Sequence, residues 1–244
     1  MALERILEPE VMDSEKEAQE YNDMDHSAVN QKYVQELLDF AQTALGYAGE
    51  EQGDPDDEDE FSLGDVLDLG TGTALIPVEL CKQHSECRVM AIDMAASMLD
   101  LAYYNIEAHS MTERINLAQV DAKKMSYEDA MFDTAISNSI IHHLADPLSS
   151  LREMARVTCE GGVIFVRDLM RPDDVETLDE IVQTYAGEES EYSKKLFRDS
   201  LHAALSLSEI REMVAQLGYD PESVQATSDR HWTWATLNNR NTDV

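Results

Sequence analysis

Two carboxylates near the ends of apolar segments carry the clearest chemical signal in this sequence. Asp68 lies in the run Val66–Leu69, which leads into a turn containing Gly70 and Gly72, and Asp93 ends a second apolar run. A strand that passes through glycines into a helix presents unpaired backbone N–H groups to a ligand. Glycine also allows a ligand to approach where a Cβ atom would collide. These features predict a site for a cofactor that contains a nucleoside.

The residue after the turn tests whether the cofactor is a dinucleotide. A dinucleotide fingerprint that starts at Gly70 requires glycine or alanine at position 75, and the sequence has Leu75 there. The sequence therefore disfavours a dinucleotide.

Two further strand patterns also end in polar residues. Leu117–Asp121 predicts a third strand and Phe132–Asn138 a fourth, and His142 and His143 follow the fourth. Strands that alternate with helices form a parallel sheet, and ligands bind where the carboxyl ends of its strands meet. We therefore expect one crevice to collect all these polar groups.

In these motifs, over residues 65–168, the sequence resembles the class I methyltransferases that use S-adenosylmethionine, and the order of elements extends the resemblance to about residue 237. The resemblance implies an α/β, Rossmann-like fold with a seven-stranded, mostly parallel sheet and helices on both faces. It implies that Asp68 and the glycine turn hold the methionine part of the cofactor, that Asp93 holds the ribose and that Asp121 holds the adenine. The expected cofactor-binding residues are Asp68, Gly70, Thr71, Gly72, Asp93, Met94, Asp121, Ala122, Asn138 and Ser139. Ala74 departs from the glycine of the family's turn, which the fold should tolerate if residue 74 has helical backbone angles.

The histidines after the fourth strand are candidates for proton transfer. An imidazole titrates near neutrality, so His142 or His143 could act as a general base. The alternative is that each packs beside Leu144 and forms hydrogen bonds to the backbone. With Asn138 and Tyr185 they make up the candidate catalytic residues. We expect no metal site, because the spacing of the histidines in the sequence does not resemble that of metal ligands; those considered are His26, His142, His143, His202 and His231.

The chain divides into three segments by composition and pattern. Residues 1–49 predict two helices, from Ser14 to about Met24 and from near Ser27, that could cover the carboxyl edge of the sheet as a lid or as simple cover. Residues 50–62 form an acidic linker, with eight carboxylates between Glu50 and Glu60. Residues 63–244 form the cofactor-binding domain.

A helical insertion, residues 171–206, is expected after a fifth strand at Val163–Asp168. Its predicted helices are Asp173–Tyr185 and Ser193–Leu205. Insertions at the carboxyl edge of such a sheet commonly set the specificity for the acceptor. Its candidate pocket residues are Tyr185, Tyr192, Arg198, Ser200 and His202.

Composition limits the partners that this chain can bind. It has 18 Lys and Arg residues against 50 Asp and Glu residues, a formal net charge of −32, which disfavours nucleic acid because binding phosphates requires clustered cations. Three cysteines without metal spacing fit a reducing cytoplasm. No run is long and apolar enough to predict a membrane span. The oligomeric state, monomer or homodimer, is left open.

By resemblance, the expected activity is S-adenosylmethionine-dependent methyl transfer to a small-molecule acceptor. Two alternatives stand beside it. The stretch Ile136–Pro147 also resembles S-adenosylmethionine cyclases, which make azetidine-2-carboxylate and methylthioadenosine from the cofactor itself. The second alternative is a protein that binds the cofactor without catalysis.

Overall fold

A seven-stranded sheet forms the centre of the computed structural model, which describes residues 3–8, 15–23, 26–47 and 61–239. Its strands are β1 (Asp65–Leu69), β2 (Arg88–Asp93), β3 (Ile115–Gln119), β4 (Phe132–Asn138), β5 (Thr158–Leu169), β6 (Val224–Ala226) and β7 (His231–Leu237). Their spatial order is β3-β2-β1-β4-β5-β7-β6, and only β7 runs antiparallel to its neighbours. The predicted α/β, mostly parallel sheet is confirmed.

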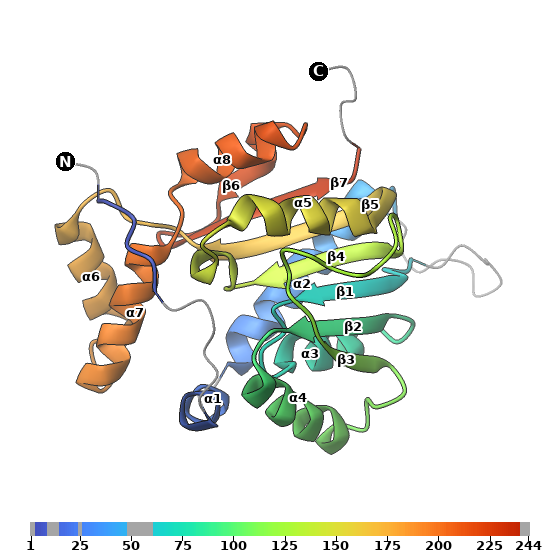
Figure 1. Cartoon of the computed structure of the whole chain (residues 1–244), viewed down its shortest axis with the longest axis horizontal. Helices are drawn as coiled ribbons and strands as arrows, with labels where there is room; N and C mark the ends of the chain where they lie inside the picture. Colours follow the sequence, from blue (N-terminus) through green and yellow to red (C-terminus); the bar gives the residue numbers. More distant parts are fainter. Residues whose placement is uncertain (1–2, 9–14, 24–25, 48–60, 240–244) are drawn as a thin grey trace.

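Helices cover both faces of this sheet (Figure 1). The α-helices are α1 (Glu15–Asn22), α2 (Ser27–Ala44), α3 (Leu75–Gln83), α4 (Ala96–Ala108), α5 (Pro147–Val157), α6 (Val175–Ala186), α7 (Glu191–Ala203) and α8 (Leu207–Gln216), and there are two short 3₁₀ turns, η1 (Ile141–His143) and η2 (Pro221–Ser223). Two caps that the sequence indicates fix helix starts: Asp146 accepts a hydrogen bond from the Ser149 N–H, and Ser206 forms a capping box with Glu209.

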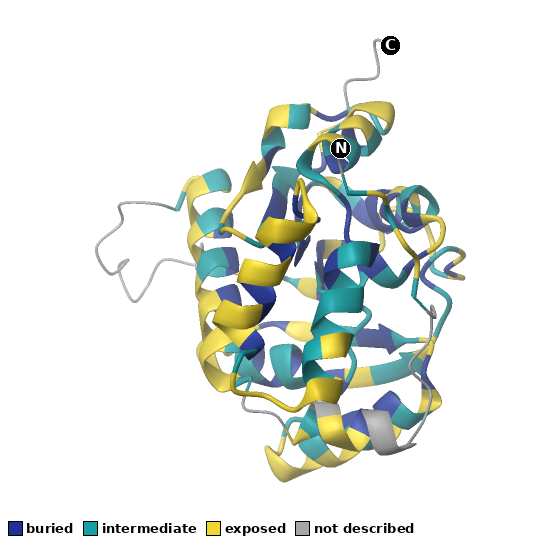
Figure 2. Ribbon diagram, turned by 90° about the vertical axis from the view of Figure 1, so that its left-hand side faces the viewer, coloured by how far each residue is buried: buried dark blue, intermediate teal, exposed yellow. Residues whose placement is uncertain are grey.

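Alternating side chains of the strands build two cores, one on each face. In β5, Val163 and Phe165 join the core beneath α2 and α3, whereas Ile164 and Val166 join the core beneath α5 and α8. Successive side chains on a strand point to opposite faces, so a strand covered on both sides must be apolar throughout. Figure 2 shows the result, with buried strands inside a layer of helices whose outward faces are exposed.

The N-terminal helices occupy different places. Tyr33, Val34 and Leu37 of α2 are buried in the sheet core, and the Tyr33 hydroxyl donates to the backbone carbonyls of Ser137 and Phe165 at 3.1 and 3.2 Å. The expectation that α2 packs over the carboxyl edge is therefore wrong, because this helix packs on the face of the sheet. By contrast, α1 packs Ala18 against residues at the start of α4. Residues 48–60, most of the predicted acidic linker, lie outside the described residues.

The insertion forms a hairpin of α6 and α7 at the end of the sheet where the parallel strands finish (Figure 1). Leu178, Ile181 and Leu201 pack together in it, and Leu3 packs against them. Residues 3–8, here called the N-terminal strap, continue beside this hairpin. Backbone N–H groups of Leu3 and Ile6 donate to the carbonyls of Asp173 and His202 at 3.0 and 3.1 Å.

Two strand boundaries differ from the expectation. β5 begins at Thr158, before the glycine pair, because Phe132 of β4 pairs with Thr158 across a register shift. β3 ends at Gln119, so Asp121 lies in the following turn. No helix in the described part of the chain is long and apolar enough to cross a membrane.

Asn238 should stabilise the end of the sheet. Its buried side-chain amide donates to the carbonyls of Ala155 and Thr158 at 3.1 and 2.6 Å, and its side-chain oxygen accepts from the Tyr219 hydroxyl. We expect Asn238→Ala to lower the free energy of unfolding by about 2–3 kcal/mol, because buried polar groups lose their partners. The exposed neighbour Asn239→Ala should change it by about 0.5 kcal/mol or less. Urea denaturation measures both, and equal stabilities would contradict the assignment.

Candidate functional site

The glycine turn after β1 is attached to β2 and faces open space. The N–H groups of Gly70 and Thr71 donate to the Ile92 carbonyl at 2.8 and 2.9 Å. Gly70 and Gly72 have φ angles of 74° and 55°, in the left-handed region that favours glycine. A Cβ atom on Gly70 would collide with Ile140, whereas one on Gly72 would meet nothing within 4 Å. The loop after β4 thus packs against the turn, and Gly72 faces the space that a ligand can enter.

Ala74, which follows this turn, does not meet the condition under which the fold was expected to tolerate alanine easily, because its backbone is left-handed. Its φ and ψ angles are 59° and 25°, and the residue is fully buried. A left-handed backbone at a residue other than glycine costs roughly 1–2 kcal/mol. The site therefore keeps local strain where the family's turn has glycine.

Asp93 lies beside the turn and accepts a hydrogen bond from it. Its two carboxylate oxygens accept hydrogen bonds from the N–H groups of Gly72 at 2.8 Å and Ala95 at 2.9 Å. A carboxylate offers about four acceptor positions, so two backbone donors leave capacity for ligand hydroxyls. Met94, the next residue, is exposed.

Asp68 is a buried carboxyl group beside the turn. Burial raises the pKa of Asp68 to about 7, the charge of Asp93 adds to this effect and the Thr71 hydroxyl offsets it in part. The nearby Thr73 hydroxyl is also buried and has no hydrogen-bond partner within the described residues. A positively charged hydrogen-bond donor would therefore find an acceptor here that becomes ionised near neutral pH.

Asp121 is engaged locally in its turn. Its carboxylate accepts from the Lys123 N–H at 2.9 Å and forms an ion pair with the Lys123 ammonium at 3.3 Å. Ala122 is buried beside it. The predicted adenine contacts by this pair stay a prediction.

His142 and His143 lie in the loop after β4, against Glu8 of the N-terminal strap. His142 Nδ1 is 2.5 Å from Asp168 Oδ1, and the Glu8 Oε1 atom is 3.6 Å from His142 Nε2 and 3.2 Å from His143 Nδ1. We call Glu8, His142 and His143 the strap cluster. The Ser200 hydroxyl of α7 donates to Glu8 Oε1 at 3.1 Å. The cluster therefore joins three separate parts of the chain.

Charges within this group shift several pKa values. Burial by itself lowers the pKa of His142, but Asp168 and Glu8 outweigh it, so the net pKa lies above the usual value. Burial by itself raises the pKa of Asp168, but His142, the Leu169 N–H and the charge of His143 bring it below the usual value. Burial raises the pKa of Glu8, and the charge of His142 offsets this in part. Asp168 is thus ionised, so the Nδ1–H of His142 donates to it.

Of the remaining predicted residues, Asn138 and Ser139 lie at the end of β4, and Tyr185 lies on α6 of the insertion. Asn138 ends β4 and is partly buried, and Ser139, with a φ angle of 57°, donates its N–H to the Arg167 carbonyl at 3.0 Å. Tyr185 is exposed, its hydroxyl donates to Asp229 at 2.7 Å and the Arg230 guanidinium lies over its ring. The structure brings the histidines together, whereas the Tyr185 hydroxyl donates to Asp229, and a catalytic role for Tyr185 stays a prediction.

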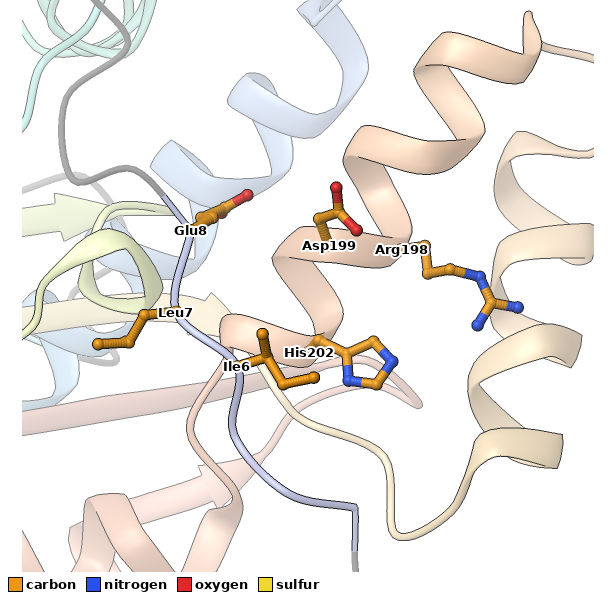
Figure 3. Close-up of a pocket in the computed structure, with 6 residues that line it drawn as sticks. All are labelled: Ile6, Leu7, Glu8, Arg198, Asp199 and His202. Carbon is orange, nitrogen blue, oxygen red and sulfur yellow. The ribbon is translucent and has the colours of Figure 1, made fainter.

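A cavity of about 360 Å³ opens beside the strap cluster, between the strap and α7 (Figure 3). It is lined by Ile6, Leu7, Glu8, Arg198, Asp199 and His202. Of the five candidate pocket residues in the insertion, Arg198 and His202 line it and Ser200 binds Glu8. Tyr192 is exposed, and Tyr185 is not among the lining residues. Glu8 belongs to both the cavity and the cluster.

Sequence reasoning missed three residues of this site. Glu8 stands in a polar N-terminal stretch, Asp168 ends a strand pattern, and Arg5 has no motif around it. The Arg5 guanidinium donates to the carbonyls of Ala203, His142 and Leu144 at 2.6, 3.2 and 3.1 Å, so it fixes the strap to the loop. The position of Asp168 at a strand end was the one available signal.

Comparison with known proteins agrees with this geometry. A family model described as a methyltransferase domain matches residues 61–224. The release factor glutamine methyltransferase of Chlorobaculum tepidum is 40% identical over 76 residues, which cover 30% of this chain and 26% of that protein. The demethylmenaquinone methyltransferase of Mycolicibacterium paratuberculosis is 33% identical over 109 residues, which cover 45% of this chain and 43% of that one. The chain thus matches less than half the length of these curated relatives.

A solved structure resembles the whole fold. The protein from Methanococcus maripaludis, described as a candidate S-adenosyl-L-methionine-dependent methyltransferase, aligns with a TM-score of 0.65 at 17% identity. The alignment covers 98% of this chain and 99% of that one. At this identity the likeness shows the fold, while the family model shows the relationship: the chain belongs to the family of methyltransferase domains.

Proposed function

We propose that this protein binds S-adenosylmethionine and transfers its methyl group to a small-molecule acceptor. The observation that carries the proposal is the arrangement of the glycine turn with Asp68 and Asp93 at one edge of a parallel sheet. The open space at Gly72 and the unpartnered, buried Thr73 hydroxyl fit a ligand with polar groups. When bound, this cofactor supplies a methyl group activated by a sulfonium.

The residues of the turn have separate roles in this proposal. Asp93, whose carboxylate also accepts from the N–H groups of Gly72 and Ala95, accepts from the ribose hydroxyls. Asp68, when ionised, accepts from the ammonium of the methionine part, and the backbone of the turn approaches the same part. The ordered loop after β4, held by Asp168, limits the access of water to the edge where Asn138 and Ser139 lie.

The proposal of a small-molecule acceptor rests on the cavity. One relative is named for demethylmenaquinone, a small molecule, and another for a glutamine of a release factor, a protein. The names of the relatives therefore do not indicate which class of acceptor this chain uses. A volume of about 360 Å³ suits a metabolite, and the strap and α7 enclose it. Arg198, Asp199 and His202 give it polar groups of both charges. His143 can take a proton from an acceptor, whereas the buried His142, held by Asp168, orients the loop.

Replacement of Asp93 tests the cofactor site. Asp93→Ala removes the ribose acceptor and two supports of the turn, so the affinity for S-adenosylmethionine should fall by about 2–3 kcal/mol, a loss of roughly 30- to 150-fold. Asp100→Ala, an exposed carboxylate on α4, should leave the affinity unchanged. Isothermal titration calorimetry measures both variants. Unchanged affinity in a folded Asp93→Ala protein would refute the assignment.

The pH dependence of binding tests Asp68. Its pKa of about 7 means that the free protein must lose a proton before the carboxylate accepts from an ammonium. Affinity should therefore rise with pH through neutrality, by up to about tenfold per pH unit below the pKa. Asp68→Asn cannot titrate and should flatten this rise, while any titration of the ligand's own amine stays in both profiles. Parallel profiles for the two proteins would contradict this role.

Product analysis tests the reaction. With methyl-labelled S-adenosylmethionine and a metabolite extract, the label should enter a small molecule while S-adenosylhomocysteine accumulates in equal amount. Asp93→Ala should slow both together. Methylthioadenosine formed from the cofactor alone would instead support cyclisation, and Asn138→Ala should then suppress it. Neither product from folded, cofactor-saturated protein would support binding without catalysis.

A further inference from the structure

We propose that the strap cluster is a binding site for a divalent transition-metal ion of the zinc type. Glu8, His142 and His143 each offer a ligand atom, and these atoms all lie within 4.8 Å of one another. The inference does not rest on the proposed cofactor site, because the cluster lies outside the glycine turn and its carboxylates, but a bound ion would engage His143, which is proposed above to take a proton from an acceptor. It revises the expectation of no metal site, which rested on spacing along the sequence.

The distances in the cluster suit a tetrahedral ion. Zinc binds imidazole nitrogen and carboxylate oxygen at about 2.0–2.2 Å, which places neighbouring ligand atoms of a tetrahedron roughly 3.3–3.6 Å apart. Glu8 Oε1 lies 3.2 Å from His143 Nδ1 and 3.6 Å from His142 Nε2. The two histidine nitrogens lie within 4.8 Å of each other, so an ion would draw these side chains together.

Neighbouring groups orient these ligands as they do in metal sites. Asp168, fully buried, accepts the Nδ1–H of His142 at 2.5 Å, which turns the Nε2 atom toward the cluster, where an ion would replace any proton on it. A carboxylate behind a histidine ligand fixes its tautomer and makes the other nitrogen a better ligand. Ser200 donates to Glu8 at 3.1 Å and holds that carboxylate.

The ligand set selects the class of ion. Two imidazoles and one carboxylate favour zinc and its first-row neighbours, whereas calcium and magnesium prefer oxygen ligands only. Three protein ligands leave a fourth position for water or for a donor atom of a bound molecule. Because Glu8 also lines the cavity, a molecule bound there could supply that atom.

An ion at this place would fasten the N-terminal strap to the loop after β4. Glu8 comes from the strap and the two histidines from the loop, and Arg5 already joins the same segments through the carbonyls of His142 and Leu144. An ion that binds the folded protein in preference to the unfolded chain also raises its stability. The bound ion would therefore hold the strap, which lines the cavity, against the loop after β4, and it would stabilise the folded protein.

The experiment uses the full chain after treatment with a chelator. Zinc is titrated by calorimetry, and cobalt is titrated with its visible d–d absorption as the readout of coordination geometry. We expect a single ion per chain, the intense absorption of tetrahedral cobalt and a higher melting temperature with zinc. Glu8→Gln and His143→Gln should each weaken binding by at least about tenfold and abolish the gain in melting temperature.

His202→Gln is the matched control, because His202 lines the same cavity but lies outside the cluster. It should bind the ion as the unaltered protein does. Circular dichroism of each metal-free variant establishes that it is folded, and two cluster variants are used so that a folding failure of one leaves the test intact. The proposal would be overturned if the unaltered protein bound no ion. It would also be overturned if the folded Glu8→Gln and His143→Gln proteins bound the ion as tightly as the unaltered protein does.

Discussion

The buried carboxylate of Asp168 holds the loop after β4 against the end of β5. One of its oxygens accepts from the backbone N–H groups of Ile141 and His142, at 2.5 and 3.3 Å, and the other from His142 Nδ1 and the Leu169 N–H. A buried charge is tolerated only when its hydrogen-bonding capacity is used, and here the loop supplies most of the donors. The orientation of both histidines, the contact with Glu8 and the wall of the cavity all follow from this interaction.

The second constraint is the close approach of the turn after β1 and the loop after β4. Ile140 occupies the place where a side chain on Gly70 would lie, and both segments contain non-glycine residues with left-handed backbones, Ala74 and Ser139. Backbone strain of this kind persists only where the surrounding structure enforces it. Asp93 helps to enforce it by binding the N–H of Gly72. Contacts within the protein thus hold the turn in this conformation, and a turn that is already held loses little entropy on binding a ligand.

Elements with a strong local pattern could be predicted well. The apolar runs of β1 and β2 lie where the sequence places them, because a strand that is buried on both faces has a local cause in its own apolar residues. The position of α2 could not be predicted, because an apolar stripe shows that a helix buries one face but not the surface that it meets. The backbone angles of Ala74 could not be predicted either, since the turn around it, and not its own preference, sets them.

The sequence by itself determined the sheet, the glycine turn and the carboxylates that end its strands, because these depend on side-chain alternation and on backbone freedom over a few residues. Only the tertiary structure decided that Glu8 meets His142 and His143, that Arg5 joins the strap to their loop and that Tyr185 binds Asp229 instead. These contacts join segments far apart in the chain. Their formation depends on how the strap, the insertion and the sheet pack together, and no spacing within one segment encodes that packing.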